Sequence, residues 1–158
     1  MNRIGIGIDV HRFAPNRKLI MGGAQIPYEL GLEGHSDADV LVHAIADALL
    51  GAAALGDIGK FYPDTDMKWK NMDSLIILRD VAEKYRQIKA KINNIDCAIV
   101  AQAPKISPHI PKMQEIIAAN LGITPQQVGI KATTSELMGF TGRKEGVVAI
   151  AMVSVEMP

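Results

Sequence analysis

The sequence predicts a single α+β domain over residues 1–158, with a mixed β-sheet covered by helices on one face. Its 158 residues suit one compact domain and are too few for two ordinary ones. Strand-like and helix-like segments alternate without repeats, linkers or low-complexity stretches. Hydrophobic residues make up 48% of the chain and aromatic residues only 4%. Because this apolar content is generous for a small domain, we expect the other face of the sheet to pack against another subunit of a homo-oligomer.

Two strands are expected at the start of the chain. Residues 3–9 alternate isoleucine with glycine, and Leu19-Ile20-Met21 is a second short extended run. Gly5 and Gly7 do not indicate a dinucleotide site, because the next glycine and helix are missing at the required spacing. We expect these glycines to permit close packing between strands. Residues 27–36 are predicted to form a loop.

A long helix is predicted from about Asp37 to Leu55, because this segment is dense in alanine and leucine. Ser36 is the expected N-cap, and Asp37 and Asp39 would stand in the first turn, where the helix dipole favours acidic side chains. Gly56 would end the helix.

The second half of the chain continues the alternation of helices and strands. A loop over residues 57–70 precedes a helix over residues 73–89 and a buried strand over residues 92–101. Proline after serine or threonine then marks two helix starts, a helix from Ser107 to about Gly122 and a shorter turn at Thr124. The closing strands are expected over residues 128–133 and 146–155, with a glycine-rich loop over residues 139–146 between them.

Charge and targeting signals exclude several classes of function. Lysine plus arginine and aspartate plus glutamate number 17 each, so no excess positive charge is available for nucleic acid or an anionic membrane. Any anionic ligand must therefore be held by a local site. The N-terminus lacks the apolar stretch of a signal peptide, and charged residues interrupt the most apolar segment, so we expect a cytoplasmic protein without a membrane span. The single cysteine, Cys97, lies in a predicted strand and is expected to be an inert core thiol.

A metal site is the strongest chemical signal in the sequence. Side chains two residues apart in a strand point the same way, so Asp9 and His11 can address one point if the first strand continues through them. An oxygen and an imidazole nitrogen suit zinc, which takes three protein ligands in most catalytic sites. His43 is the best candidate for the third ligand, because an unpartnered imidazole in an apolar helix would be costly.

The surroundings of His43 leave two interpretations open. Asp39, His43 and Asp47 are spaced four residues apart and form one polar stripe on the helix, so Asp39 or Asp47 can orient the imidazole. The alternative is a hydrogen-bonded core histidine beside ordinary helix charges. An Asp-x-His pair taken alone is likewise more often structural than metal-binding.

Five motifs nevertheless occur in order along essentially the whole chain. They are Asp9-Val10-His11; residues 34–44, GHSDADVLVHA; residues 56–59, GDIG, with residues 63–66, PDTD; residues 101–105, AQAPK; and residues 131–136, KATTSE, with residues 139–143, GFTGR. This combination closely resembles the 2-C-methyl-D-erythritol 2,4-cyclodiphosphate synthase family.

The resemblance implies a reaction and an assembly. Members of this family convert 4-diphosphocytidyl-2-C-methyl-D-erythritol 2-phosphate to the cyclic diphosphate and CMP, a step of the non-mevalonate isoprenoid pathway. They act as homotrimers with active sites between neighbouring subunits, so the uncovered face of the sheet would turn toward the centre of a trimer. The reaction is an intramolecular phosphoryl transfer, in which positioning and charge neutralisation carry the catalysis.

The resemblance also assigns roles to residues. Zn²⁺ would be held by Asp9, His11 and His43 and would take a phosphate oxygen in its open position, and Glu136 would bind Mg²⁺ or Mn²⁺ with the substrate diphosphate. His35 and Thr134 would stabilise the transition state. The residues expected to contact the substrate are Asp9, Val10, His11, His35, Ser36, Asp57, Ile58, Gly59, Phe61, Tyr62, Pro63, Asp64, Thr65, Asp66, Ala101, Gln102, Ala103, Pro104, Lys105, Ile106, Ser107, Thr133, Thr134, Ser135, Glu136, Phe140 and Arg143.

The substrate contacts divide into three regions. Residues 57–66 would hold the methylerythritol part, residues 101–107 would wrap the cytidine of a neighbouring subunit's substrate through backbone groups, and Arg143 would clamp phosphate. Viewed singly, each region also fits an ordinary surface turn, a proline turn or a flexible loop.

The chain departs from the family at a few positions. Ile6, Ile8 and Ile150 replace polar or aromatic residues that line the central cavity of some members, so an isoprenoid diphosphate ligand is not expected there. Ile106-Ser107 replaces a common Met-Leu pair near the cytidine.

One rival function, a zinc-dependent phosphohydrolase in which the metal ionises water, would use the same Asp9, His11 and His43. A second rival, a non-enzymatic nucleotide-binding trimer with structural zinc, predicts a closed site of four ligands, and the sequence supplies only three convincing ones.

Overall fold

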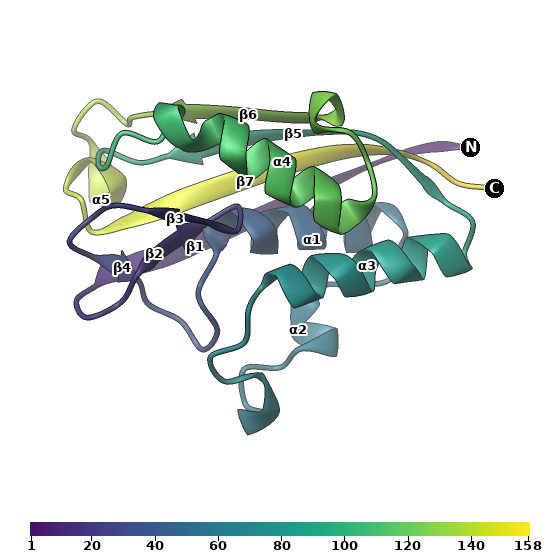
Figure 1. Cartoon of the computed structure of the whole chain (residues 1–158), viewed down its shortest axis with the longest axis horizontal. Coiled ribbons are helices and arrows are strands. Elements are labelled where there is room, and N and C mark those ends of the chain that lie inside the picture. The colour runs from purple at the N-terminus through teal and green to yellow at the C-terminus, as the bar shows by residue number, and fades with distance from the viewer.

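The computed structural model describes residues 1–158 as a mixed sheet with helices on one side (Figure 1). The strands are β1 (Asn2–Ala14), β2 (Leu19–Met21), β3 (Ala24–Ile26), β4 (Gly31–Leu32), β5 (Lys91–Val100), β6 (Val128–Thr133) and β7 (Gly146–Glu156). The helices are α1 (Val40–Ala52), α2 (Ile58–Phe61), α3 (Leu75–Gln87), α4 (Ile110–Leu121) and α5 (Gly139–Gly142), with short 3₁₀ turns η1 (Met67–Trp69), η2 (Ser107–His109) and η3 (Pro125–Gln127).

The main sheet has the strand order β4-β1-β7-β5-β6. All its pairs are antiparallel except β5 with β6, which run parallel. Strands β2 and β3 form a separate hairpin. The chain termini meet at one end of the sheet, where the Met1 amino group donates to the Met157 carbonyl oxygen at 2.7 Å (Figure 1).

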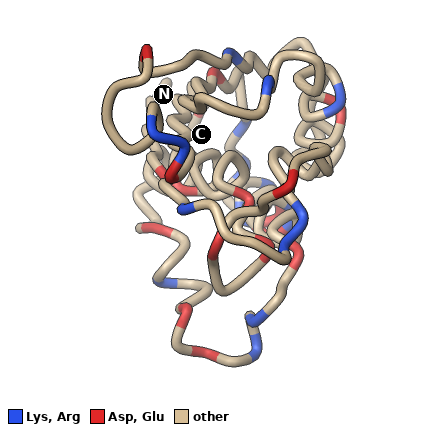
Figure 2. Tube along the Cα trace, turned by 90° about the vertical axis from the view of Figure 1, so that its left-hand side faces the viewer, with Lys and Arg blue, Asp and Glu red and all other residues tan.

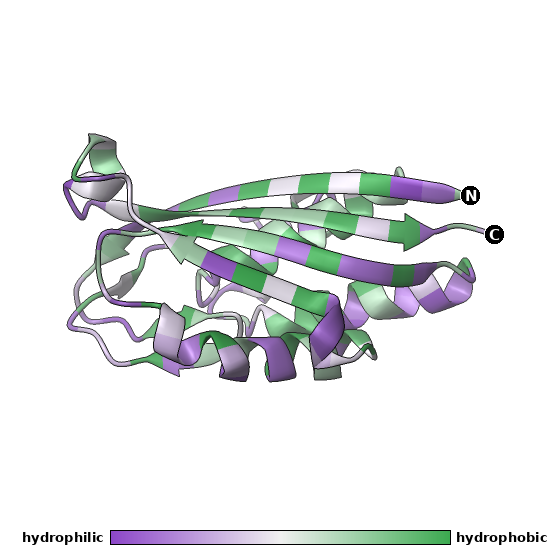
Figure 3. Cartoon of the chain, turned by 90° about the horizontal axis from the view of Figure 1, so that it is seen from above, coloured by the Kyte–Doolittle hydropathy of each residue, from purple (hydrophilic) through white to green (hydrophobic).

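One face of the sheet carries the core. Gly7, Ala151, Cys97 and Ile130 lie in one row across β1, β7, β5 and β6, and neighbouring rows on this face bring in further small aliphatic side chains. Helices α1, α3 and α4 lie on this side, as Figure 3 shows. Helix α1 is buried around almost its whole circumference, which explains why its sequence is apolar on every side.

Glycine in β1 lets α1 lie directly against the strand. A Cβ atom at Gly5 would stand 1.9 Å from the Ala48 carbonyl oxygen, and one at Gly7 would stand 2.0 Å from the Ala44 carbonyl oxygen. The sequence predicted close packing between strands at these glycines, whereas the structure uses them for a helix. The physical reason is the same, because only a residue without a side chain permits such an approach.

The opposite face of β1 and β7 is apolar and uncovered by helices (Figure 3). Its exposed side chains include Ile4 (72% exposed), Ile6 (59%), Ile8 (57%), Val10 (51%) and Met152 (50%). A continuous apolar stripe of this kind on a small domain marks an interaction surface.

Most predicted elements are confirmed with shifted ends. The strands at Leu19–Met21 and Val128–Thr133 have the predicted bounds, and β1 continues through Asp9 and His11 as the metal argument required. The sequence missed β3 and the short β4, which lies in the predicted loop over residues 27–36. It also missed α2 and η1 in the predicted loop over residues 57–70, and α5 in the glycine-rich segment. These elements are too short for periodicity to reveal.

The predicted cap of the long helix is wrong. The helix begins at Val40 rather than Asp37, and its N-cap is Asp39, whose side chain accepts from the Val42 N–H at 3.0 Å. Ser36 instead accepts from the Ala38 N–H within the preceding turn. Ala38 has a φ of 57°, which no helical residue adopts, so the chain turns here before the helix starts.

Charge, hydropathy and the single cysteine can also be placed on the structure. Basic and acidic residues are interspersed along the trace in Figure 2. No helix is long and apolar enough to cross a membrane. Cys97 is buried in β5 and burial raises its pKa to about 12, so the prediction of an unreactive core thiol is confirmed.

The contact between β1 and α1 gives a first test. We expect Gly7→Val to lower the free energy of unfolding by at least about 1–3 kcal/mol, because the added side chain must displace the α1 backbone. Gly51→Ala is the control. Gly51 lies in α1 itself, with nothing within 4 Å of an added Cβ. Alanine there should raise the free energy of unfolding by about 0.5–1 kcal/mol. Urea unfolding measures both. A Gly7→Val variant as stable as the parent would contradict the packing described.

Candidate metal centre and active site

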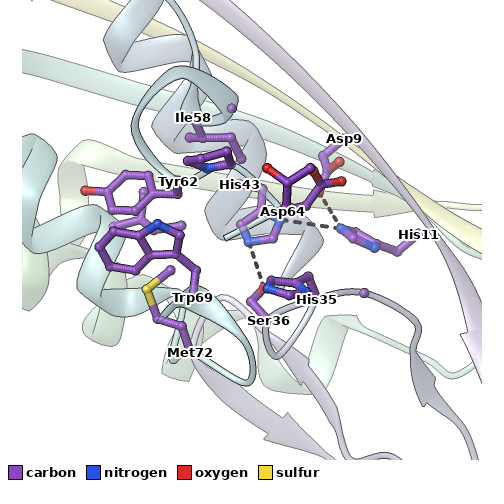
Figure 4. Close-up of a pocket in the computed structure, with 15 residues that line it drawn as sticks. Asp9, His11, His35, Ser36, His43, Ile58, Tyr62, Asp64, Trp69 and Met72 are labelled. Carbon is purple, nitrogen blue, oxygen red and sulfur yellow. Dashed lines mark hydrogen bonds and ion pairs between the residues drawn. The ribbon is translucent and has the colours of Figure 1, made fainter. Parts of the chain in front are cut away.

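Asp9, His11 and His43 converge at the end of β1 next to the first turn of α1 (Figure 4). Asp9 and His11 share the strand face of Gly5 and Gly7, so they point toward the helix. Asp9 Oδ2 lies 2.9 Å from His11 Nε2 and 3.1 Å from His43 Nδ1, and the two nitrogens are 3.4 Å apart. They are the one group of potential ligands whose atoms all lie within 4.8 Å of one another. This triangle is suited to a single metal ion.

The far side of each imidazole is held by a hydrogen bond. His11 Nδ1 donates to the Glu33 carbonyl oxygen at 2.6 Å, so Nε2 is the nitrogen that faces Asp9. His43 presents Nδ1 to Asp9, and its Nε2 lies 2.9 Å from Ser74 Oγ. Both rings therefore aim a nitrogen at the same point.

Neither acidic residue of the predicted α1 stripe holds His43. Asp39 is fully buried and accepts from the N–H groups of Gly22 and Gly23, at 2.8 and 2.7 Å, in addition to capping α1. Asp47 accepts from the Ile58 N–H at 2.7 Å. The expectation that Asp39 or Asp47 orients the imidazole is therefore wrong, since both carboxylates bind backbone groups of neighbouring segments instead.

The three side chains perturb one another's protonation. Burial raises the pKa of Asp9, but hydrogen bonds from His11 and His43 outweigh burial and hold it well below its usual range. Burial lowers the pKa of His11, but its hydrogen bond to Asp9 and the charge of that carboxylate outweigh burial, so the pKa is raised.

The cluster forms one wall of a cavity of about 590 Å³ (Figure 4). The polar wall consists of the three clustered residues with His35 and Ser36, and the other side carries Ile58, Tyr62, Trp69 and Met72 in Figure 4. The complete lining is Asp9, His11, Gly34, His35, Ser36, His43, Ile58, Gly59, Tyr62, Pro63, Asp64, Thr65, Trp69, Met72 and Ile77. A cavity with one polar and one apolar side is suited to a small amphipathic ligand.

The segment over residues 57–72 covers this cavity and is tied down at several points. Asp57 caps α2 by accepting from the Lys60 N–H at 3.0 Å. The Tyr62 hydroxyl donates to Asp80 of α3, and the Tyr62 ring meets Trp69 edge to face, with 5.1 Å between ring centroids. His35 Nε2 lies 3.2 Å from the Asp66 carbonyl oxygen. Asp57, Phe61 and Asp66 are not among the lining residues.

A second, separate cavity of about 290 Å³ gathers the other predicted substrate contacts. It lies where the parallel strands β5 and β6 end, and it shares no lining residue with the first cavity. Its lining is Ala101, Gln102, Ala103, Pro104, Lys105, Ile106, Ser107, Ala132, Thr133 and Thr134. Within one chain, the predicted site residues therefore form two groups.

The remaining predicted residues lie outside both cavities. Val10 and Phe140 line a small hollow beside His11. Arg143 is exposed and pairs with Glu145 at 2.7 Å, and this pairing raises the Arg143 pKa. Ser135 Oγ donates to the Met138 carbonyl oxygen. Glu136 is exposed, and its carboxylate lies 3.5 Å from Thr134 Oγ1, beside the second cavity.

Sequence reasoning missed several residues that shape the first cavity. Trp69, Met72 and Ile77 line it, and Ser74 contacts His43 from behind. Trp69 is the only tryptophan in the chain, which is a weak indication of a binding site. The sequence around Ser74 gives no indication of a role in the site, because a serine directly before a helix is ordinarily an N-cap.

Comparisons with known proteins agree on one family. The family model described as the YgbB family matches residues 2–156. A 2-C-methyl-D-erythritol 2,4-cyclodiphosphate synthase of Geobacter sulfurreducens is 58% identical, covering 98% of each chain, and one of Clostridium perfringens is 59% identical, covering 92% of this chain and 93% of its own.

Solved structures give the same result. The CDP complex of IspF from Plasmodium falciparum superposes with a TM-score of 0.87 at 30% identity, covering 99% of this chain and 96% of its own. The bifunctional IspDF from Campylobacter jejuni superposes with a TM-score of 0.96 at 45% identity over 100% of this chain. The chain spans 43% of that longer protein.

The coupled ionisation of Asp9 and His11 predicts a pH window for the metal-free protein. The lowered Asp9 pKa stabilises the fold above the ordinary aspartate pKa of about 3.9, and this contribution is lost as pH falls through the folded value. The raised His11 pKa stabilises it below the ordinary histidine pKa of about 6.5, and this contribution is lost as pH rises through the folded value. The Asp9 and His11 contributions to stability are therefore both present between about pH 4 and 6.5.

Unfolding of the parent and of Asp9→Asn, both in chelator, measures this window. The stability difference between them should be largest inside it and should shrink on both sides. A difference that stays constant from about pH 3 to 9 would show that the pair is not coupled as described.

Proposed function

The chain belongs to the YgbB family of 2-C-methyl-D-erythritol 2,4-cyclodiphosphate synthases, and from this membership and the site geometry we propose how its residues divide the work. The enzyme converts 4-diphosphocytidyl-2-C-methyl-D-erythritol 2-phosphate to the 2,4-cyclodiphosphate with release of CMP, the cyclising step of the non-mevalonate pathway. The phosphohydrolase and non-enzymatic alternatives are not favoured, because the named relatives match at this identity over nearly the whole chain.

We assign Zn²⁺ to Asp9, His11 and His43. In an ideal tetrahedron with bonds of 2.0–2.1 Å, ligand atoms stand about 3.3–3.4 Å apart. The three separations of 2.9, 3.1 and 3.4 Å are close to that size. One carboxylate oxygen and two neutral imidazole nitrogens suit zinc, and the cavity leaves room for a substrate oxygen on the open side. This donor triangle is the observation that carries the proposal.

A second cation, Mg²⁺ or Mn²⁺, is assigned to Glu136. Its exposed carboxylate is a hard oxygen donor without an ion-pair partner, as suits a cation bound mainly by phosphates and water. When bound, the two cations would neutralise charge on the reacting diphosphate.

The protein's own residues position the substrate and donate to it. We propose that His35, at the polar wall of the first cavity, and Thr134, in the second, donate hydrogen bonds to the phosphate in transfer. Lys105 and Arg143 would contact phosphate from the nucleotide side. Arg143 would then exchange its present partner, Glu145, for the substrate. Holding the 2-phosphate in line with the β-phosphorus is the main catalytic task.

The two cavities suggest which half of the substrate each one holds. We place the methylerythritol in the first cavity, where Asp64 supplies a carboxylate and Ile58 and Tyr62 supply apolar contacts. Asp57 would contribute from the α2 N-cap, beside the lining residues. We place the cytidine against residues 101–107, where backbone groups at the end of β5 offer donors and acceptors. The CDP complexes of relatives are in keeping with a nucleotide site.

A homotrimer accounts for both the divided site and the exposed stripe. The apolar face of β1 and β7 would be buried at the centre, and the first cavity of one subunit would meet the second cavity of its neighbour. We do not propose an isoprenoid ligand for the centre, because Ile6, Ile8 and Ile150 leave it without polar groups there. A cytoplasmic location is also part of the proposal, supported by a single cysteine that is buried and unpaired.

The metal assignment predicts different losses for three histidines. His43→Ala should lose the tightly bound zinc and nearly all activity, because one of the three donors is removed. His35→Ala should keep zinc but lose about 10²–10³-fold in kcat, because only a donor to the transition state is removed. His109→Ala is the control, since it lines neither cavity, and should keep both.

Elemental analysis gives the zinc content, and phosphorus NMR follows the formation of cyclic diphosphate and CMP from the cytidylyl substrate. Stoichiometric zinc in His43→Ala would remove this residue from the ligand set. Linear hydrolysis products from the parent protein would contradict the proposed division of roles.

The proposed trimer predicts that two inactive variants complement each other. His43→Ala damages the first cavity and Glu136→Gln the group beside the second, so a mixed trimer contains some sites built from two intact halves. Random mixing in equal amounts should restore about a quarter of the parent activity. The variants are mixed in mild denaturant, refolded together and assayed for CMP release. Activity no higher than that of the separate variants would place each site within one subunit.

A further inference from the structure

Ser74 lies directly before α3 and does not cap it. A serine at this position ordinarily turns its hydroxyl onto the N–H groups of the first helical turn. Here Asp73 Oδ1 accepts from the Leu75 N–H at 2.9 Å, and the Ser74 side chain, which is fully buried, points the other way. Its Oγ lies 2.9 Å from His43 Nε2. The hydroxyl therefore serves something other than the helix.

The second partner of this hydroxyl is Asp37. Ser74 Oγ donates to Asp37 Oδ1, and the Ser74 backbone N–H donates to Asp37 Oδ2 at 3.1 Å. An ionised carboxylate can only accept, and a hydroxyl has a single proton to give. With that proton directed at Asp37, Ser74 Oγ faces His43 as an acceptor. Ser74 therefore favours a proton on His43 Nε2, which is the tautomer that would leave Nδ1 free for a metal ion beside Asp9.

The neighbouring hydroxyl of Ser36 is a poorer partner. Ser36 Oγ stands 3.4 Å from His43 Nε2 and 3.4 Å from Ser74 Oγ, and it already accepts from the Ala38 N–H at 3.2 Å. Ser74 is closer to the imidazole and has the carboxylate behind it. The chain Asp37–Ser74–His43 is therefore the stronger hydrogen-bonded path.

The backbone holds this path in place. The Asp37 N–H donates to the Met72 carbonyl oxygen at 3.1 Å, and the Asn71 N–H donates to the His35 carbonyl oxygen at 2.8 Å. The turn before α1 and the end of the segment covering the cavity are thus paired. Ser74 lies two residues beyond Met72, and Asp37 lies in the paired turn, so their contact depends on the pairing.

We propose that Ser74 is a positioning residue that, together with Asp37, fixes the tautomer and ring orientation of His43 so that Nδ1 faces the metal position. The Ser74 hydroxyl lies between the Asp37 carboxylate and the His43 imidazole and is hydrogen-bonded to both. Hydrogen-bond partners of this kind orient a metal-binding histidine and make its other nitrogen a stronger electron-pair donor to the metal. The proposal rests on the proposed metal role of His43, but its first test needs no metal.

The tautomer is measured on metal-free protein by long-range proton–nitrogen NMR of the histidine rings, at a pH where they are neutral. The parent should show a substantial share of the Nε2-protonated tautomer of His43, because Ser74 Oγ accepts at 2.9 Å while Asp9 competes for a proton on Nδ1. Ser74→Ala should shift the population toward the Nδ1-protonated tautomer, because the Nε2 side then lacks its close acceptor while Asp9 still accepts from Nδ1. Ser36→Ala is the matched control and should keep the parent tautomer. An unchanged tautomer in Ser74→Ala would overturn the proposal.

Zinc affinity, measured by competition with a chromophoric chelator, is the second readout. Ser74→Ala should bind zinc about 10–100-fold more weakly, and Asp37→Asn should weaken binding in the same direction. A changed tautomer with affinity within about twofold of the parent would also overturn the proposal. If the parent binds no zinc, the proposed metal role fails, while the tautomer result still decides whether Ser74 orients His43.

Discussion

The close approach of α1 to β1 is the contact on which the rest of the structure depends. Gly5 and Gly7 leave no side chain between strand and helix, so backbone atoms of Ala44 and Ala48 occupy the space where Cβ atoms would stand. The next two residues on the same face of the strand are the candidate ligands Asp9 and His11. Because α1 packs directly against β1, the imidazole of His43 in its first turn lies next to both side chains.

The packed pair of α1 and β1 also anchors the neighbouring loops, including the segment over residues 57–72 that covers the cavity. The buried helix is tied at its start to the β2–β3 hairpin through Asp39 and near its end to the cover segment through Asp47. Both carboxylates accept from backbone N–H groups that would otherwise be unpaired. Asp39 and Asp47 therefore hold neighbouring loops against α1. The cavity lies between the candidate metal ligands and the segment over residues 57–72.

The sequence was sufficient for features with a long-range pattern. Alternation in β1 predicted that Asp9 and His11 share a face, and one histidine in an apolar helix stood out as their partner. The motifs predicted the family, which the comparisons confirm. The orientation of His43 was not predictable, because Ser74 comes from a segment 31 residues away and its local pattern indicates a helix cap. The start of α1 was misplaced because serine and aspartate are equally good caps, and only the turn geometry selects Asp39.

The most direct test of the central claim is an anomalous diffraction map, recorded at the zinc absorption edge, of crystals grown with zinc and CDP. We predict one peak per subunit, bonded to Asp9 Oδ2, His11 Nε2 and His43 Nδ1 at about 2.0–2.1 Å, with α1 still in contact with the glycines of β1. A peak elsewhere in the chain, or coordination of His43 through Nε2, would contradict the account.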